Sequence, residues 1–97
     1  LNAKERNEAP ILFRSLKMAK QKALSEKASA ITICNEIKNS IINNSSGKID
    51  YIGCVNAETL EPLKRINGKV MLAIAVRFGK TRLIDNIIFS KNESKKL

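Results

Sequence analysis

One change in the spacing of apolar residues limits the possible folds of this chain more than any other feature. Before about residue 45, apolar residues recur every three or four positions, and from Lys48 onward they alternate or form short runs. The first period is that of helices with one buried face, and the second is that of β-strands. Helices followed by a separate series of strands indicate an α+β domain.

Two to three helices are expected in the first half. Asn2 and Glu5 have the spacing of a capping box, whereas Pro10 lacks the amide hydrogen that a helix interior requires. We therefore predict a short helical turn, a break, and a main helix that restarts with Pro10 in its first turn. A second main helix is predicted over residues 28–43, before a polar turn.

Three strands are expected in the second half, over residues 49–55, 70–76 and 81–89. Residues 70–76 are apolar on both faces, which is typical of a strand that is central or buried on both sides. Short turns at Asn67-Gly68 and Gly79-Lys80 indicate an antiparallel meander. The predicted fold class is α+β, with two to three helices packed on a small three-stranded antiparallel sheet.

The length of 97 residues suits one domain. We place it at residues 1–89, followed by a disordered tail at residues 90–97. The connector at residues 57–62 is polar except for Leu60, which we expect to anchor it in the core. No apolar run approaches the roughly 20 residues that cross a bilayer, so no membrane partner is expected.

The net charge of +9 raises the question of a polyanion partner. Aromatic residues make up only 4% of the chain, and no basic run exceeds two residues, whereas nucleic-acid binding normally needs an organised basic face with stacking aromatics. A solvated helix face explains the charge more simply. A stand-alone basic nucleic-acid-binding module is the alternative function, and an interaction domain that dimerises through a sheet edge is a third.

Residues suited to catalysis are scarce. The chain contains no histidine, the commonest general base and metal ligand. Cys34 and Cys54 match no zinc-ligand spacing; we expect free, buried thiols in a reducing compartment, the cytoplasm, although two cysteines alone leave a disulfide open. Glu58 and Glu61 lie in the polar connector, where solvated charges are the simpler interpretation than an acid–base pair.

Two further polar groups have structural interpretations. The segment Gly79-Lys80-Thr81 resembles the end of a phosphate-binding loop, but it lacks the upstream glycine and is interpreted as a hairpin turn. Asp85 and Asn86 lie side by side in the third predicted strand, so at least one of them faces the core side or an edge. There it needs a hydrogen-bond partner, for which a nearby turn or the backbone is the simpler interpretation and a contact to a partner domain is the alternative. The residues alone therefore predict no complete active site.

A series of four segments in the second half resembles the C-terminal domain of bacterial pantoate–β-alanine ligases, the pantothenate synthetase family. In order, these segments are IDYI at 49–52, TLEPL at 59–63, RFGK at 77–80 and TRLIDNI at 81–87. The opening helical stretch, with Glu5-Arg6 and Ala9-Pro10, also resembles the family. Gly53, Cys54 and Asn56 depart from the acidic or aliphatic residues that the family more often carries there, which would alter the contacts of that strand.

The resemblance implies an ATP-dependent ligase that condenses pantoate with β-alanine through a pantoyl-adenylate, releasing AMP and pyrophosphate. The parent enzyme would use ATP and Mg, be cytoplasmic and homodimeric, and bind no nucleic acid. This domain would be a lid over an N-terminal nucleotide-binding domain, its partner.

The family's catalytic histidines and its phosphate-binding segment precede the matched region. We therefore assign no catalytic, cofactor-binding or metal-binding residue within residues 1–97, and expect the chain alone to be inactive with no cofactor bound. Lys80 and Arg82 are expected to help steer ATP and pantoate.

Overall fold

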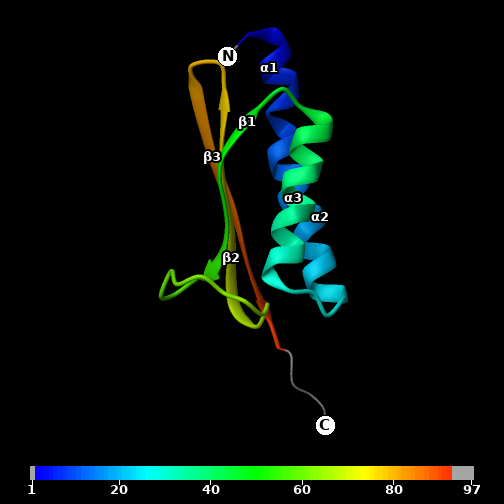
Figure 1. Cartoon of the computed structure of the whole chain (residues 1–97), viewed down its shortest axis with the longest axis vertical. Helices are drawn as coiled ribbons and strands as arrows, with labels where there is room; N and C mark the ends of the chain where they lie inside the picture. The colour runs from blue at the N-terminus through cyan, green and yellow to red at the C-terminus, as the bar shows by residue number, and fades with distance from the viewer. Residues whose placement is uncertain (1, 93–97) are drawn as a thin grey trace.

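The computed structural model describes residues 2–92 and has helices and strands in two layers. Along the chain, helices α1 (Ala3–Glu8), α2 (Pro10–Ser25) and α3 (Ala30–Asn44) precede strands β1 (Lys48–Asn56), β2 (Gly68–Phe78) and β3 (Thr81–Lys91). All three helices lie on one side of the sheet (Figure 1). The predicted α+β class, with helices on a three-stranded antiparallel sheet, is confirmed.

The helices begin where local hydrogen bonding allows it. The amide of Glu5 donates to Asn2 Oδ1 at 2.7 Å and the amide of Asn2 donates to Glu5 Oε1 at 3.1 Å, which is the predicted capping box. Helix α2 restarts at Pro10, as predicted, because the missing amide hydrogen is harmless in a first turn. Helix α3 begins at Ala30 because Ser29 caps it.

The sheet has the order β1-β2-β3, and both strand pairs are antiparallel. Strand β2 is therefore central, as its apolar sequence indicated. Its alternate residues Val70, Leu72, Ile74, Val76 and Phe78 are buried towards the helices, where they meet Leu12 and Leu16 of α2 and Ile33, Ile37 and Ile41 of α3. The core thus lies between the helix layer and one face of the sheet.

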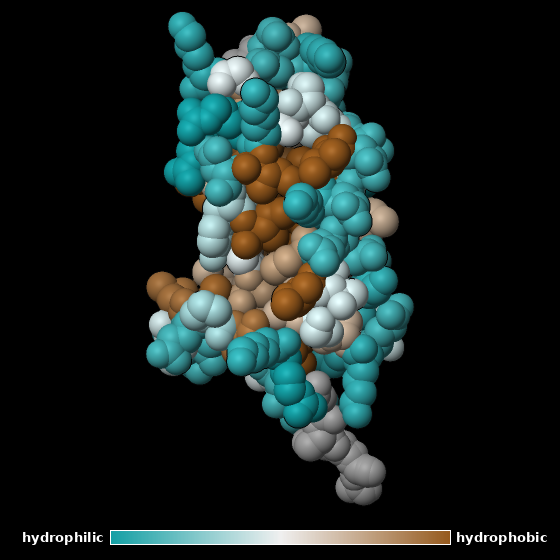
Figure 2. All heavy atoms as spheres, viewed as in Figure 1, coloured by the Kyte–Doolittle hydropathy of each residue, from teal (hydrophilic) through white to brown (hydrophobic). Residues whose placement is uncertain are grey.

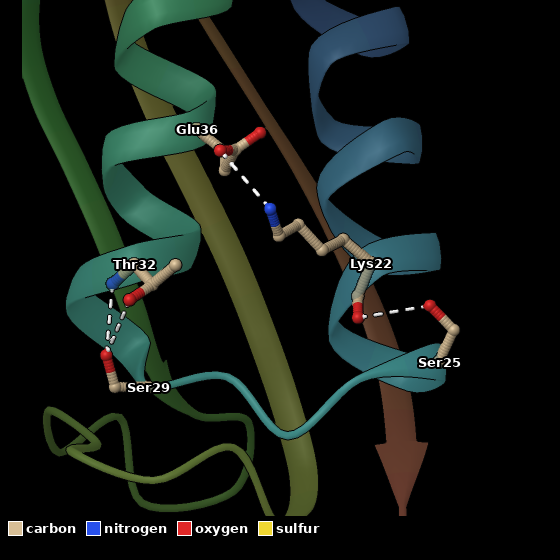
Figure 3. A network of polar contacts seen from close by, with 5 residues as sticks. All are labelled: Lys22, Ser25, Ser29, Thr32 and Glu36. Carbon is tan, nitrogen blue, oxygen red and sulfur yellow. Dashed lines mark hydrogen bonds and ion pairs between the residues drawn. The ribbon is translucent and has the colours of Figure 1, made fainter.

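Helices α2 and α3 are also joined by polar contacts at their exposed side (Figure 3). Lys22 Nζ lies 3.3 Å from Glu36 Oε2 across the two helices. At the C-terminal end of α2, Ser25 Oγ donates to the Lys22 carbonyl at 3.4 Å, and at the start of α3, Ser29 Oγ lies 3.0 Å from Thr32 Oγ1. These contacts fix the turn between the helices.

The end of β3 differs from the predicted domain boundary. Strand β3 continues to Lys91, two residues past the predicted end at residue 89, so residues 90 and 91 belong to the sheet. The reason is a contact that is remote in sequence: Lys91 Nζ donates to the carbonyls of Ala23 at 2.5 Å and Glu26 at 2.7 Å, at the C-terminal end of α2. Residues 93–97 of the predicted tail lie outside the described residues.

The expectation that Leu60 anchors the connector was wrong. Leu60 is 62% exposed and has a positive φ of 64°. The side chain of Asn56 accepts from the two amides that follow Ala57, and the Leu60 amide donates to the Asn56 carbonyl at 2.8 Å, so the chain turns sharply and directs Leu60 outward. The whole segment between β1 and β2, residues 57–67, is anchored instead after the connector, by Ile66, which is fully buried, and by the partly buried Leu63.

Candidate functional site

The sheet has one face covered by helices and a second face that no helix covers, which we call the open face. Because strand residues alternate between faces, cross-strand pairing defines its members. The open face comprises Lys48, Tyr51, Gly53 and Val55 of β1, Met71, Ala73, Ala75 and Arg77 of β2, and Arg82, Ile84, Asn86 and Ile88 of β3. It therefore draws on all three strands.

The middle of the open face is apolar except for Asn86, which is exposed and pairs with Ala73. Ile84 is 68% exposed, Ile88 is 53% exposed and Tyr51 is 47% exposed, and the small side chains of Ala73 and Ala75 lie between them. Exposed apolar residues grouped in this way mark a contact surface more often than scattered ones do. The open face is thus suited to being covered by another body of protein.

Gly53 explains how the Tyr51 side chain lies on this face. A Cβ atom built on Gly53 would overlap the hydroxyl and ring of Tyr51, so the tyrosine lies along the strand directly over the glycine. The other two residues that we expect to depart from the family have structural roles: Cys54 is buried in the core, and Asn56 Oδ1 accepts from the amide of Glu58 at 2.8 Å. Of the three residues, Gly53 is therefore the one that shapes the surface of β1 on the open face.

One end of the open face carries a cluster of charges. Asp50 Oδ2 accepts from Arg77 Nη2 and from Arg82 Nε, each at 3.1 Å. Asp50 has no direct cross-strand partner, because the β1–β2 register shifts between Ile49 and Tyr51. Such bulges re-aim a side chain, and here the carboxylate reaches two arginines on neighbouring strands.

An apolar groove of about 360 Å³ lies between α3 and the edge strand β1. Figure 2 shows it as a band of brown and tan atoms between the helix layer and the sheet. Cys34 and Cys54 both line this groove, and both are free thiols; Cys54 is buried, as predicted, whereas Cys34 is only partly buried. Burial raises the pKa of Cys34, and burial together with the charge of Cys34 raises the pKa of Cys54 to about 11, so neither is an activated nucleophile.

The polar residues considered from the sequence do not converge on one site. Glu58 and Glu61 are exposed in the connector, and Gly79 and Lys80 form the turn between β2 and β3. Asp85 lies half-buried on the helix-facing side of β3, where its Oδ1 accepts from the Asn86 amide at 2.8 Å. That bond is the structural role expected for this pair.

Neither a metal centre nor a membrane span is found in the described part of the chain. Among residues 2–92, no three His, Cys, Asp or Glu side chains are grouped so that they could hold a metal ion. These residues therefore do not fit a bound Mg²⁺. Over the same residues, no helix has both the length and the apolar character needed to cross a membrane.

Comparison with known proteins gives the decisive observation. The family model for pantoate-β-alanine ligase matches residues 1–88. This chain belongs to the pantoate-β-alanine ligase family. The resemblance seen in the sequence is thereby confirmed, and the segments that carried it include both the bulged end of β1 and the β2–β3 hairpin.

Individual members of the pantoate-β-alanine ligase family are similar over nearly the whole chain. The pantothenate synthetase of Bacillus pumilus is 43% identical over 94 residues, which are 97% of this chain and 32% of that relative. The pantothenate synthetase of Thermosipho melanesiensis is 49% identical over 88 residues, 91% of this chain and 31% of the relative. The chain thus spans about a third of the length of the curated relatives it matches.

A solved structure of the same family agrees with this fold. The crystal structure of pantothenate synthetase from Thermus thermophilus superposes with a TM-score of 0.80 at 29% identity. The superposition covers 90% of this chain and 31% of that chain. The two-layer arrangement described above is therefore the family's arrangement over this stretch.

Proposed function

We propose that this chain is the C-terminal lid domain of an ATP-dependent ligase that joins pantoate to β-alanine. The carrying observation is that a family match over residues 1–88 accounts for only about a third of the curated relatives' length. A free carboxylate is a poor electrophile, so the proposed route activates pantoate as an adenylate, from which the amine displaces AMP after pyrophosphate has left. That intermediate reacts with water, and a lid excludes water from it.

The partner of this lid is proposed to be the N-terminal nucleotide-binding domain of the same protein. The apolar middle of the open face supports this, because β2 is apolar on both sides while the helices cover only one. Mg would be bound by the partner domain, since residues 2–92 offer no grouped metal ligands, and the nucleotide-binding domain would hold the ATP that this lid covers. No residue of this chain is assigned to the reacting atoms.

Two further features of the parent protein are proposed. A cytoplasmic location is proposed because both cysteines are free thiols. A homodimeric parent rests on the family resemblance alone. The alternative of a stand-alone nucleic-acid-binding module is not supported by the comparisons.

A chimera tests the proposed function. In the Bacillus pumilus relative, the stretch matched by this chain is replaced with residues 1–97, and formation of pantothenate and release of AMP are measured with ATP, pantoate and β-alanine. Three matched proteins accompany it: the relative itself, the relative without that stretch, and this chain alone. We expect activity in the relative and the chimera, and none in the shortened relative or in the chain alone.

Two results would overturn the proposal. A folded chimera that lacks activity, beside an active parent relative, would show that this domain cannot serve as the lid. Activity of the shortened relative equal to that of the whole protein would show that the stretch has no role in the reaction. Circular dichroism of each protein establishes that it is folded before its activity is compared.

A further inference from the structure

Three basic residues form a single row across the whole sheet at the charged end of the open face. Lys48 of β1 pairs with Arg77 of β2, and Arg77 pairs with Arg82 of β3. Lys80 lies in the turn just beyond this row. With strands about 4.8 Å apart, a row over three strands is about 10 Å wide. We call Lys48, Arg77 and Arg82 the basic row.

The basic row places like charges next to one another on neighbouring strands. Like charges placed directly opposite one another on neighbouring strands are destabilising, and here two such pairs follow in succession. Asp50 supplies one negative charge against the three positive charges of the row. The row is therefore left with positive charge that an anion from outside the domain can neutralise.

The two arginines are held in place while most of their donors stay available. Each guanidinium has five N–H donors, of which Asp50 takes one from Arg77 and one from Arg82. Both side chains remain about half exposed, at 49% and 48%. Because the bulge at Asp50 sets the carboxylate between the strands, the guanidinium groups are oriented before any ligand arrives.

We propose that the basic row, with Lys80 beside it, binds a polyphosphate group such as the triphosphate of ATP or pyrophosphate. Arginine is the side chain best suited to phosphate oxygens, because its planar donors contact two oxygens at once. A linear chain of phosphates can contact several cations of a row that is spread over three strands, whereas a single carboxylate is too short to do so. That this polyphosphate is a substrate or product of the ligase rests on the proposed function. That the basic row binds polyphosphate does not rest on it.

Binding is measured on the 97-residue chain by calorimetry, with inorganic tripolyphosphate, ATP and AMP as probes, at constant ionic strength and without metal. We expect tripolyphosphate and ATP to bind more tightly than AMP, which carries one phosphate. Replacing both arginines with glutamine (R77Q/R82Q) should weaken tripolyphosphate binding about ten- to a hundredfold, since each lost charge-assisted contact accounts for about one factor of ten.

The matched control removes two positive charges elsewhere. Lys27 and Lys38 are exposed on the helix side of the domain, so K27Q/K38Q changes the net charge equally and should alter the affinity by no more than about twofold. A third variant, R77K/R82K, keeps the charge and removes the forked donors. It should fall between the wild type and R77Q/R82Q, and it covers the case in which the glutamine variant fails to fold.

Three results overturn the inference: no measurable binding of tripolyphosphate by the wild type, equal weakening in K27Q/K38Q and R77Q/R82Q, or AMP binding as tightly as ATP. The second would show a response to net charge alone. The outcome is separable from that of the chimera, because tripolyphosphate binding by this chain together with an inactive chimera would reject the ligase proposal and keep the polyphosphate site.

Discussion

Substituting two exposed isoleucines on the open face tests whether a second domain covers it. We consider I84T/I88T, which keeps the β-branched shape that strands favour while replacing the ethyl branch of each side chain with a hydroxyl. In the isolated chain both side chains are largely exposed, so each change should alter the free energy of unfolding by no more than about 0.5 kcal/mol. The effect should appear only when the partner domain is present.

The size of that effect follows from the exposed fractions. Fully burying an isoleucine side chain stabilises by about 1.5–3 kcal/mol relative to leaving it exposed. Ile84 is 68% exposed and Ile88 is 53% exposed, so covering both would add about 2–3.5 kcal/mol to closure of the lid. Threonine retains part of this apolar surface. The double substitution should therefore weaken closure by about 1–2 kcal/mol, which lowers the ratio of closed to open lid about 5- to 30-fold.

The assay is steady-state pantothenate formation by the chimera carrying I84T/I88T, with kcat/KM as the readout. The chain offers a closely matched control on its opposite layer. Ile31 and Ile42 of α3 are 74% and 53% exposed, and I31T/I42T makes the same chemical change on the helix side. We expect kcat/KM to fall about 5- to 30-fold for the open-face variant and by no more than about twofold for the control.

An unchanged kcat/KM for I84T/I88T would refute the argument that the open face is covered during the reaction. A larger loss for I31T/I42T would place the interface on the helix side, next to the apolar groove that Ile31 lines. Thermal unfolding of both isolated variants excludes the remaining explanation, which is general loss of stability. A variant that unfolds below the assay temperature is replaced by its single substitutions.

Three further predictions concern stability. Ser15 Oγ and Ser40 Oγ lie 2.7 Å apart between α2 and α3. In urea unfolding, S15A and S40A should each lower the free energy of unfolding by about 1 kcal/mol, and S15A/S40A should lower it by less than the sum of the two. Additive losses would contradict the hydrogen bond between these serines. Ser46 donates two hydrogen bonds to Glu8 and lowers the pKa of that carboxyl. The stabilisation by this ionised carboxyl is therefore complete above the pKa that Glu8 has in the unfolded chain, and it is lost as the pH falls through the lower pKa of the folded chain. E8Q should therefore make the melting temperature less dependent on pH below about pH 4, and melting temperatures of E8Q and wild type that change in parallel with pH would contradict this. Because Leu60 has a φ of 64°, L60G should raise the unfolding free energy by about 0.5 kcal/mol, and a lower urea midpoint would show that the leucine side chain is needed.

Much of the fold follows from local sequence signals. The capping box at Asn2 and Glu5, the restart at Pro10 and the alternation along β2 all depend on residues close together in the chain. Such signals predicted the helix break, the strand order and the central position of β2. The fold class could be predicted for the same reason, since one change in the spacing of apolar residues separates the helices from the strands.

The features that sequence reasoning missed depend on contacts between distant segments. The extension of β3 comes from Lys91 reaching the end of α2, 65 or more residues away. The exposed position of Leu60 comes from hydrogen bonds that reverse the connector against β1. The grouping of Asp50 with Arg77 and Arg82 requires both the strand register and its bulge. Periodicity reports which face a residue occupies, and it carries no information on register.

The side chains of the open face indicate where the proposed function of this domain resides. A sheet with small side chains at Ala73 and Ala75, larger apolar ones around them and arginines at one end has a surface shaped for contact, with no paired acid and base. In the proposed lid role, closing this surface over a reactive intermediate would exclude water and would place positive charge where phosphate groups are released. The contribution proposed for the domain therefore lies in what its open face covers. On that proposal, the domain serves a ligase without a histidine of its own.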